Sequence, residues 1–156
     1  MQTKILEIKS DSPEETELAG AKTAATAKRM GVDFIAMFGD LGAGKTAFTR
    51  GAASVLAPGA RVTSPTYAIV NEYLPNVQNE FTMPVFHFDM YRIVSDDDLD
   101  SIDFDGYLGR GMILTEWSEN IAQTDSRSVF LGHNHQDRGE FEGYFGVLRG
   151  KIKCLF

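Results

Sequence analysis

The sequence contains only one cysteine, Cys154, among 156 residues. A single thiol cannot form an intramolecular disulfide, and it cannot build a cysteine metal cluster. The chain also lacks an apolar run of about 20 residues, the length that a membrane-spanning helix needs. The first nine residues lack the apolar centre of a signal peptide. These absences predict a soluble, cytoplasmic protein with no membrane contact.

Positive charge is also scarce, because 15 Lys and Arg face 22 Asp and Glu and the net charge is −7. Broad nucleic-acid binding is driven by clustered Lys and Arg that neutralise phosphates. A chain of this charge is not expected to bind nucleic acid over a large surface. Any connection to RNA is expected to run indirectly, through a partner protein.

The sequence shows no internal repeat, low-complexity linker or break in composition. A chain of this length can bury roughly 68–70% of its unfolded surface, which is enough for a core without disulfides or metals. We therefore predict a single domain over residues 1–156.

What the chain does contain is Gly-Asp-Leu-Gly-Ala-Gly-Lys-Thr at residues 39–46, here called the glycine loop. It fits the phosphate-binding pattern G-x-x-x-x-G-K-[ST] at every fixed position. In such a loop the backbone N–H groups cradle phosphates at the start of a helix. Lys45 is then expected to reach the β- and γ-phosphates, and Thr46 to ligate Mg²⁺. A plain Gly-rich turn would have no need of Lys45 and Thr46.

The flanking sequence supports this interpretation. Residues 34–38 are continuously apolar, as in a strand buried on both faces. Residues 46–56 lack proline and end before Pro58 and Gly59, which predicts a helix. The order strand, loop, helix predicts an α/β fold, with a P-loop NTPase-like three-layer domain.

Another helix is predicted ahead of this unit. Ser12 is the expected N-cap, Pro13 the first helical residue and Glu15 the partner in a capping box. Gly31 fits the position that ends the helix. Residues 3–9 are predicted to form a short edge strand before it.

The apolar residues of this predicted helix are widely spaced. We expect its buried face to run through Leu18, Ala21, Ala25 and Met30.

Further strands are predicted at residues 67–73, 85–91 and 112–116. The first two are joined by a polar segment too short for a crossover helix, so they are expected to be antiparallel in a mixed central sheet. The acidic residues 95–105 are expected to surround a short helix. Short strands are also predicted at residues 129–131, 144–148 and 152–156.

Two carboxylates follow apolar strands, where ligands of open α/β sheets bind. They are Glu116 and Asp89. In residues 86–91, His87, Asp89 and Tyr91 alternate with apolar neighbours and should share one face. An unpartnered buried Asp89 would be costly, so it should face a cavity, a cation or donors. The alternatives are an ion pair with Arg92 or a helix cap, and for His87 and Tyr91 a packing or supporting role is at least as favoured as chemistry.

Residues 63–66, Thr-Ser-Pro-Thr, form a hydroxyl-rich segment after the predicted glycine-loop helix. This is the chain position at which switch loops of phosphate-loop NTPases sense the γ-phosphate. Spacing alone favours a plain turn equally. Trp117, next to Glu116, is either a core residue or a cover for the site.

Together these segments resemble the bacterial TsaE family, also called YjeE. The resemblance covers roughly residues 12–117 and rests on four motifs in order: the glycine loop, residues 64–67, residues 87–92 and residues 116–117. It implies a small Mg²⁺-dependent ATPase, weak alone, that supports the threonylcarbamoyl modification of adenosine 37 in tRNAs reading ANN codons. It also implies TsaB and TsaD as partners, since the family acts on the TsaB–TsaD complex.

The same resemblance implies roles for individual residues. The nucleotide would be bound by Asp40, Leu41, Gly42, Ala43, Gly44, Lys45 and Thr46, with Thr16 and Arg138 near the adenine. Thr46 and Glu116 would hold Mg²⁺. Catalysis would involve Lys45, Glu116 and Thr66, the last in the switch-like loop. Asp89 would act near the γ-phosphate, either positioning water or relaying the switch state.

Other nucleotide-dependent functions fit the sequence less well. A GTPase is disfavoured because the guanine-recognition pattern [NT]-K-x-D does not occur. A small-molecule kinase normally presents an Arg-rich lid, and the arginines here are scattered. A nucleotide-gated protein-interaction module remains closest to the favoured reading. Dependence of turnover on protein partners distinguishes these alternatives.

Overall fold

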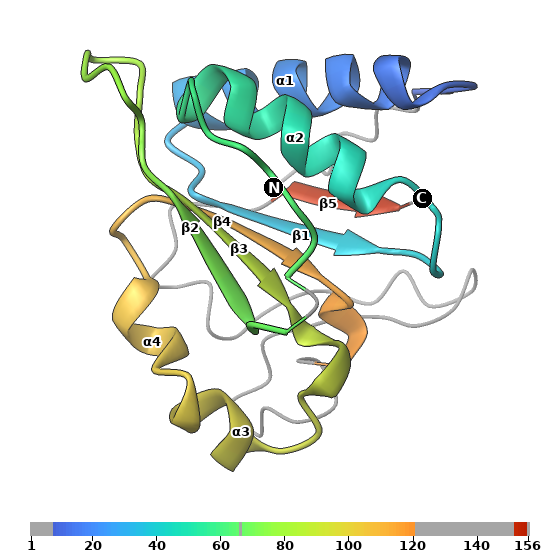
Figure 1. The fold of residues 1–156 in the computed structure, drawn as a ribbon, viewed down its shortest axis with the longest axis vertical. Coiled ribbons are helices and arrows are strands. Elements are labelled where there is room, and N and C mark those ends of the chain that lie inside the picture. Colours follow the sequence, from blue (N-terminus) through green and yellow to red (C-terminus); the bar gives the residue numbers. More distant parts are fainter. Residues whose placement is uncertain (1–7, 66, 121–151, 156) are drawn as a thin grey trace.

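A computed structural model describes residues 8–65, 67–120 and 152–155, the last of these by its backbone. Within the described residues no helix is long and apolar enough to cross a membrane. The elements of Figure 1 are α1 (Pro13–Arg29), β1 (Phe34–Phe38), α2 (Lys45–Leu56), β2 (Val70–Tyr73), β3 (Val85–Asp89), the short 3-10 helix η1 (Met90–Arg92), α3 (Asp96–Ser101), α4 (Phe104–Tyr107), β4 (Met112–Glu116) and β5 (Ile152–Leu155).

The described strands form one sheet in the order β2-β3-β4-β1-β5. Strands β3, β4, β1 and β5 are parallel, and β2 pairs with β3 in the antiparallel sense. The predicted mixed sheet and the antiparallel pair are therefore confirmed. Because β1, β3 and β4 run in the same direction, their carboxyl ends meet at one edge of the sheet.

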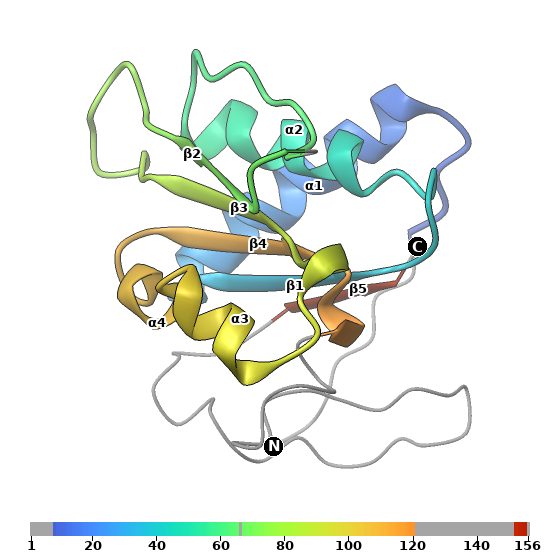
Figure 2. The ribbon, with the colours of Figure 1, turned by 60° about the horizontal axis from the view of Figure 1, so that its bottom comes forward.

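Helices cover both faces of the sheet. Figure 2 shows α1 and α2 on one face and α3 and α4 on the other. Alternate residues of β1 supply the two cores: Ile35 and Met37 pack beneath α1 and α2, whereas Phe34, Ala36 and Phe38 pack toward α3 and α4. A strand covered on both sides must be apolar throughout, as β1 is. The predicted three-layer α/β architecture is confirmed.

Helix α1 begins and ends where the sequence predicts. The Ser12 hydroxyl accepts the N–H of Glu15 at 3.2 Å. The Glu15 carboxylate accepts the N–H of Asp11 at 2.7 Å, one residue earlier than in a standard capping box. Gly31 has a φ of 70° and donates its N–H to Lys28 O at 3.1 Å, the left-handed termination that favours glycine.

The predicted buried face of α1 is wrong. Leu18 and Met30 are 54% and 68% exposed, and the buried residues are Gly20, Ala24 and Ala27. The cause is the close crossing of α1 and α2. A Cβ on Gly20 would overlap the carbonyl oxygen of Phe48. Small side chains are required at this crossing, and they override the pattern of large apolar residues.

Several predicted boundaries also differ from the structure. Strand β2 begins at Val70 rather than residue 67, and β3 ends at Asp89, so that Tyr91 belongs to η1. The acidic segment forms two short helices, α3 and α4, and Ser95 caps α3. Residues 152–155 form the predicted strand. Of the predicted strand at residues 3–9, residues 8 and 9 are irregular and the rest lies outside the described residues, as do the predicted strands at residues 129–131 and 144–148.

Gly20→Ala should destabilise the protein by about 1–3 kcal/mol, because the added methyl group forces α1 away from α2. The matched control is Thr26→Ala on the exposed side of α1, which should be neutral or slightly stabilising because alanine favours helix. Urea unfolding of both variants measures the difference. Equal stability of Gly20→Ala and the wild type would contradict this close helix packing.

Candidate functional site

The glycine loop joins the end of β1 to the start of α2. Gly42 and Gly44 adopt φ values of 81° and 104°, a region that side-chain-bearing residues rarely enter. Gly44 is the N-cap of α2, and the first turn of α2 contains no acidic residue. The loop therefore brings the positive end of the α2 dipole to the sheet edge without a carboxylate of its own in that turn.

Lys45 lies inside the site rather than on the surface, with 4% of its area exposed. Its ammonium donates to the carbonyl oxygens of Gly39 and, at 2.7 Å, of Asp40. It also lies 4.6 Å from the centre of the Trp117 ring, within the range of a cation–π contact. The cation is thus held by neutral groups, namely two carbonyls of the glycine loop itself and the Trp117 ring.

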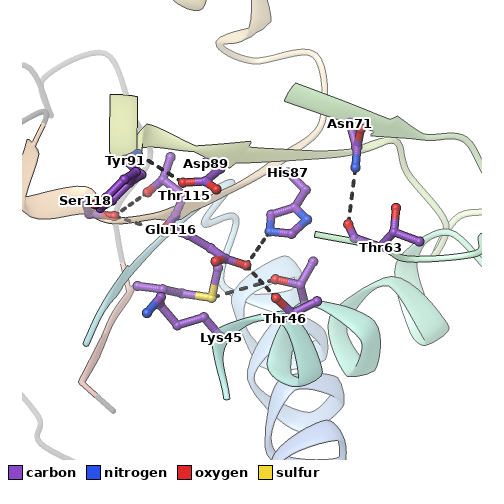
Figure 3. A network of polar contacts seen from close by, with 12 residues as sticks. Lys45, Thr46, Thr63, Asn71, His87, Asp89, Tyr91, Thr115, Glu116 and Ser118 are labelled. Atoms are coloured by element: carbon purple, nitrogen blue, oxygen red, sulfur yellow. Dashed lines mark hydrogen bonds and ion pairs between the residues drawn. The ribbon is translucent and has the colours of Figure 1, made fainter. Parts of the chain in front are cut away.

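Glu116, at the end of β4, is 5% exposed and connects three elements. Its Oε1 accepts a hydrogen bond from Thr46 Oγ1 on α2 at 3.1 Å. The same oxygen contacts Nε2 of His87 on β3 at 2.8 Å. Figure 3 shows the side chains of Glu116, His87 and Thr46 pointing toward one another beside Lys45.

Asp89 lies directly opposite Glu116 in the register of β3 and β4. Burial raises the pKa of Asp89 above its ordinary value of 3.8, and the negative charge of Glu116 raises it further. Its Oδ1 accepts the N–H of Tyr91 at 3.0 Å, so one of the roles considered for it, a helix cap, is present. Two carboxylates therefore meet at one end of the sheet.

Trp117 follows Glu116 with a φ of 55°, an uncommon conformation for a bulky residue. Its ring packs on Tyr91 with centroids 5.1 Å apart. Beside it, the hydroxyls of Thr115 and Ser118 are 2.6 Å apart, and Ser118 also donates to Thr115 O at 2.9 Å. This turn places the Trp117 ring beside Lys45 in the cavity lining, and the ring also packs against the core beneath α3 and α4, so both predicted placements are partly met.

These groups surround a cavity of about 560 Å³. Among the predicted site residues, those that line it are Leu41, Gly42, Ala43, Gly44, Lys45, Thr46, Asp89 and Glu116. Asp40 contributes its carbonyl to Lys45 and is not part of the lining.

Besides Asp40, Thr16 is the other described site residue that does not line this cavity, and two further predicted site residues are not described. Thr16 lies in the first turn of α1, where its hydroxyl bonds to Ser12 O at 3.1 Å, and it is not among the lining residues. Thr66 and Arg138 lie outside the described residues. The neighbours of Thr66, namely Ser64, Pro65 and Tyr67, do line the cavity.

The segment before Thr66 is anchored on β2 by contacts that sequence reasoning missed. The Tyr73 hydroxyl donates to Thr63 O at 2.9 Å, and the Asn71 amide donates to the same oxygen at 3.2 Å. Asn71 and Tyr73 are two positions apart on a strand, so they share a face. This alternation along the strand was the sequence signal that could have predicted that Asn71 and Tyr73 contact the same segment.

The oxygen atoms of Thr46 and Glu116 suit a hard cation such as Mg²⁺. No group of three or more His, Cys, Asp and Glu residues that could hold a metal ion occurs within the part of the chain that the structure describes. Mg²⁺ usually takes only one or two protein oxygens and completes its shell with phosphates and water. The residues present therefore fit this ion.

A glycine loop between the first parallel strand and its helix, with carboxylates at the neighbouring strand ends, defines a P-loop NTPase-like α/β domain. Residues 10–140 match the family described as "Threonylcarbamoyl adenosine biosynthesis protein TsaE". The chain belongs to this TsaE family.

Individual proteins of known name are similar to this chain and support the same family assignment. The chain is 39% identical over 121 residues to a protein of Bacillus subtilis, covering 77% of this chain and 71% of the relative. It is 40% identical over 82 residues to one of Haemophilus influenzae, covering 52% and 49%, and 32% identical over 112 residues to one of Mycobacterium leprae, covering 65% and 68%. Each is named "tRNA threonylcarbamoyladenosine biosynthesis protein TsaE". The matched segment spans about half of the Haemophilus protein.

Asp89→Asn should raise the melting temperature at pH 7–8. A folded-state pKa above the unfolded value means that ionised Asp89 disfavours the fold, an effect absent below pH 3.8 and growing as the pH rises through the raised pKa. Asparagine keeps an oxygen for the Tyr91 N–H. Thermal unfolding from pH 4 to pH 8 should therefore show a gain that increases with pH. A gain that is the same at every pH would contradict the assigned charge effect.

Proposed function

We propose that this chain binds ATP with Mg²⁺ in the cavity at the glycine loop and hydrolyses it. We further propose that it does so as a component of the tRNA threonylcarbamoyladenosine modification system, with the TsaB–TsaD complex as partner. The observation that carries the proposal is the convergence of Lys45 and Thr46 with Glu116 and Asp89 at one sheet edge. Membership of the TsaE family supports the pathway.

The phosphates would be held by the loop itself. Its backbone N–H groups and the start of α2 favour an anion, and Lys45 adds a full positive charge. In the structure this buried ammonium has carbonyl oxygens as partners. An anionic phosphate oxygen is a stronger acceptor than a neutral carbonyl, so exchange of partners would favour binding.

Thr46 and Glu116 would hold Mg²⁺, which would neutralise charge on the phosphates. Asp89 would orient the attacking water. It lines the cavity beside Glu116, and burial makes it a more basic carboxylate than an exposed aspartate. Glu116 would then bind the metal, and Asp89 would position the water.

The rim of the cavity supports a requirement for a partner. Leu41 and Tyr67 line the cavity yet are 91% and 96% exposed, and Tyr91 is also exposed. Water exclusion strengthens the electrostatic interactions on which phosphoryl transfer depends. Large apolar side chains at an open rim fit closure by a second protein surface. ATP is preferred over GTP because the sequence lacks the guanine-recognition pattern.

Phosphate release should rise well above that of either component when the purified chain, TsaB–TsaD and ATP with Mg²⁺ are mixed. The reason is that the partner surface would complete an otherwise open site. A coupled phosphate assay measures it, with each protein alone as control. No increase, or phosphate transferred to an added metabolite as in a kinase, would refute the proposal.

Glu116→Ala and Asp89→Ala should separate the two carboxylates. The first should weaken Mg²⁺-dependent ATP binding, because a metal ligand is lost. The second should leave binding largely intact and lower turnover with TsaB–TsaD by about 10²–10⁴-fold, the usual effect of losing a group that handles the reacting proton. Calorimetric binding and the phosphate assay give the two readouts.

The matched control for both variants is Asp100→Ala, which removes an exposed carboxylate on α3. It should change neither readout. Equal loss of ATP binding in Glu116→Ala and Asp89→Ala would show that the roles are wrongly divided.

A further inference from the structure

His87 is a fully buried polar residue in the middle of β3. It lies on the face of the sheet that α1 and α2 cover, because Val85, two positions earlier, packs in that core. Its Nε2 lies 2.8 Å from Oε1 of Glu116. Its Nδ1 is buried without a hydrogen-bond partner among the described residues. One ring nitrogen is thus engaged and the other is not.

With Glu116 as a carboxylate, which only accepts hydrogen bonds, the engaged nitrogen is the donor. Nε2 therefore carries a proton and points it at Glu116. The tilted ring of Tyr73, with its centroid 6.3 Å away, packs near the imidazole. Among the described residues, His87 consequently makes one side-chain hydrogen bond, from Nε2 to Oε1 of Glu116.

Core stability alone does not account for this side chain. A buried nitrogen without a partner costs free energy, and an apolar residue in the same layer would avoid the cost. What His87 supplies is orientation. Thr46 and His87 both donate to Oε1 of Glu116, from α2 and from β3. Two donors on different elements restrict rotation of the carboxylate, and neither of these two hydrogen bonds uses Oε2.

We infer that His87 is a positioning residue that presets the Glu116 carboxylate for Mg²⁺. The inference rests on the proposed function, because it concerns the same metal site. His87 is not among the residues that line the cavity, so it would act through Glu116. Groups that orient a metal-binding carboxylate in this way typically change metal affinity by 10–100-fold when they are removed.

The test compares His87→Gln with His87→Asn. Both are neutral amides, but glutamine extends an N–H donor to about the place of Nε2, whereas asparagine is one methylene too short. Binding of a non-hydrolysable ATP analogue is titrated with Mg²⁺, and measured again in excess EDTA. The control is Thr49→Val, which alters another buried polar group, bonded to the Met37 sulfur and not to Glu116.

His87→Asn should raise the Mg²⁺ concentration for half-maximal binding by about 10–100-fold, while metal-free binding stays within about twofold of wild type. His87→Gln should return the Mg²⁺ requirement to within about threefold of wild type. Thr49→Val should match the wild type. Thermal unfolding checks that each variant is folded, and His87→Leu replaces His87→Asn if the latter is not. Whichever of the two is used is called the donor-free variant, because no donor from residue 87 then reaches Glu116.

The outcomes separate this inference from the function on which it rests. If wild-type binding does not depend on Mg²⁺, the proposed function fails. If the wild type depends on Mg²⁺ but the donor-free variant requires no more Mg²⁺ than the wild type, the role of His87 is overturned and the function stands. If His87→Gln behaves like the donor-free variant, the hydrogen bond is not the cause and the inference is again overturned.

Discussion

The hydrogen bonds to Oε1 of Glu116 are the constraint on which the site depends. They join the end of β4 to α2 through Thr46 and to β3 through His87. Glu116 is almost completely buried, so its charge requires these donors. A change in any of the three elements would alter the position of one carboxylate. Oε1 of Glu116 therefore connects β4 to α2 and β3, and through these hydrogen bonds it also sets the geometry of the proposed metal site.

The sheet and its helices place these groups at one edge. Strands β1, β3 and β4 are parallel, so the glycine loop, Asp89 and Glu116 follow three neighbouring strand ends. The close crossing at Gly20 holds α2, and with it Thr46, against α1. The Trp117 ring lies beside the Lys45 ammonium, with its centre 4.6 Å from it. Packing far from the cavity consequently supports the alignment of groups within it.

The sequence predicted those parts of the fold that depend on local patterns. The continuous apolar runs of β1 and β4, the cap at Ser12 and the glycine loop all require particular residues at short spacing. The buried face of α1 was not predictable, because it depends on contact with α2. The position at which β3 ends was not predicted. The strand ends at Asp89, whose carboxylate accepts the N–H of Tyr91 and caps the following turn of 3-10 helix. The link from His87 to Glu116 spans two strands, and no local pattern shows it.

The most direct measurement is a crystal structure of the chain with a non-hydrolysable ATP analogue and Mn²⁺, which is located by its anomalous scattering. We expect phosphates in the glycine loop, and the metal bound by Thr46 and Glu116 with Asp89 beside the terminal phosphate. A metal held by Asp89 without Glu116, or a nucleotide outside the loop, would contradict the proposed site.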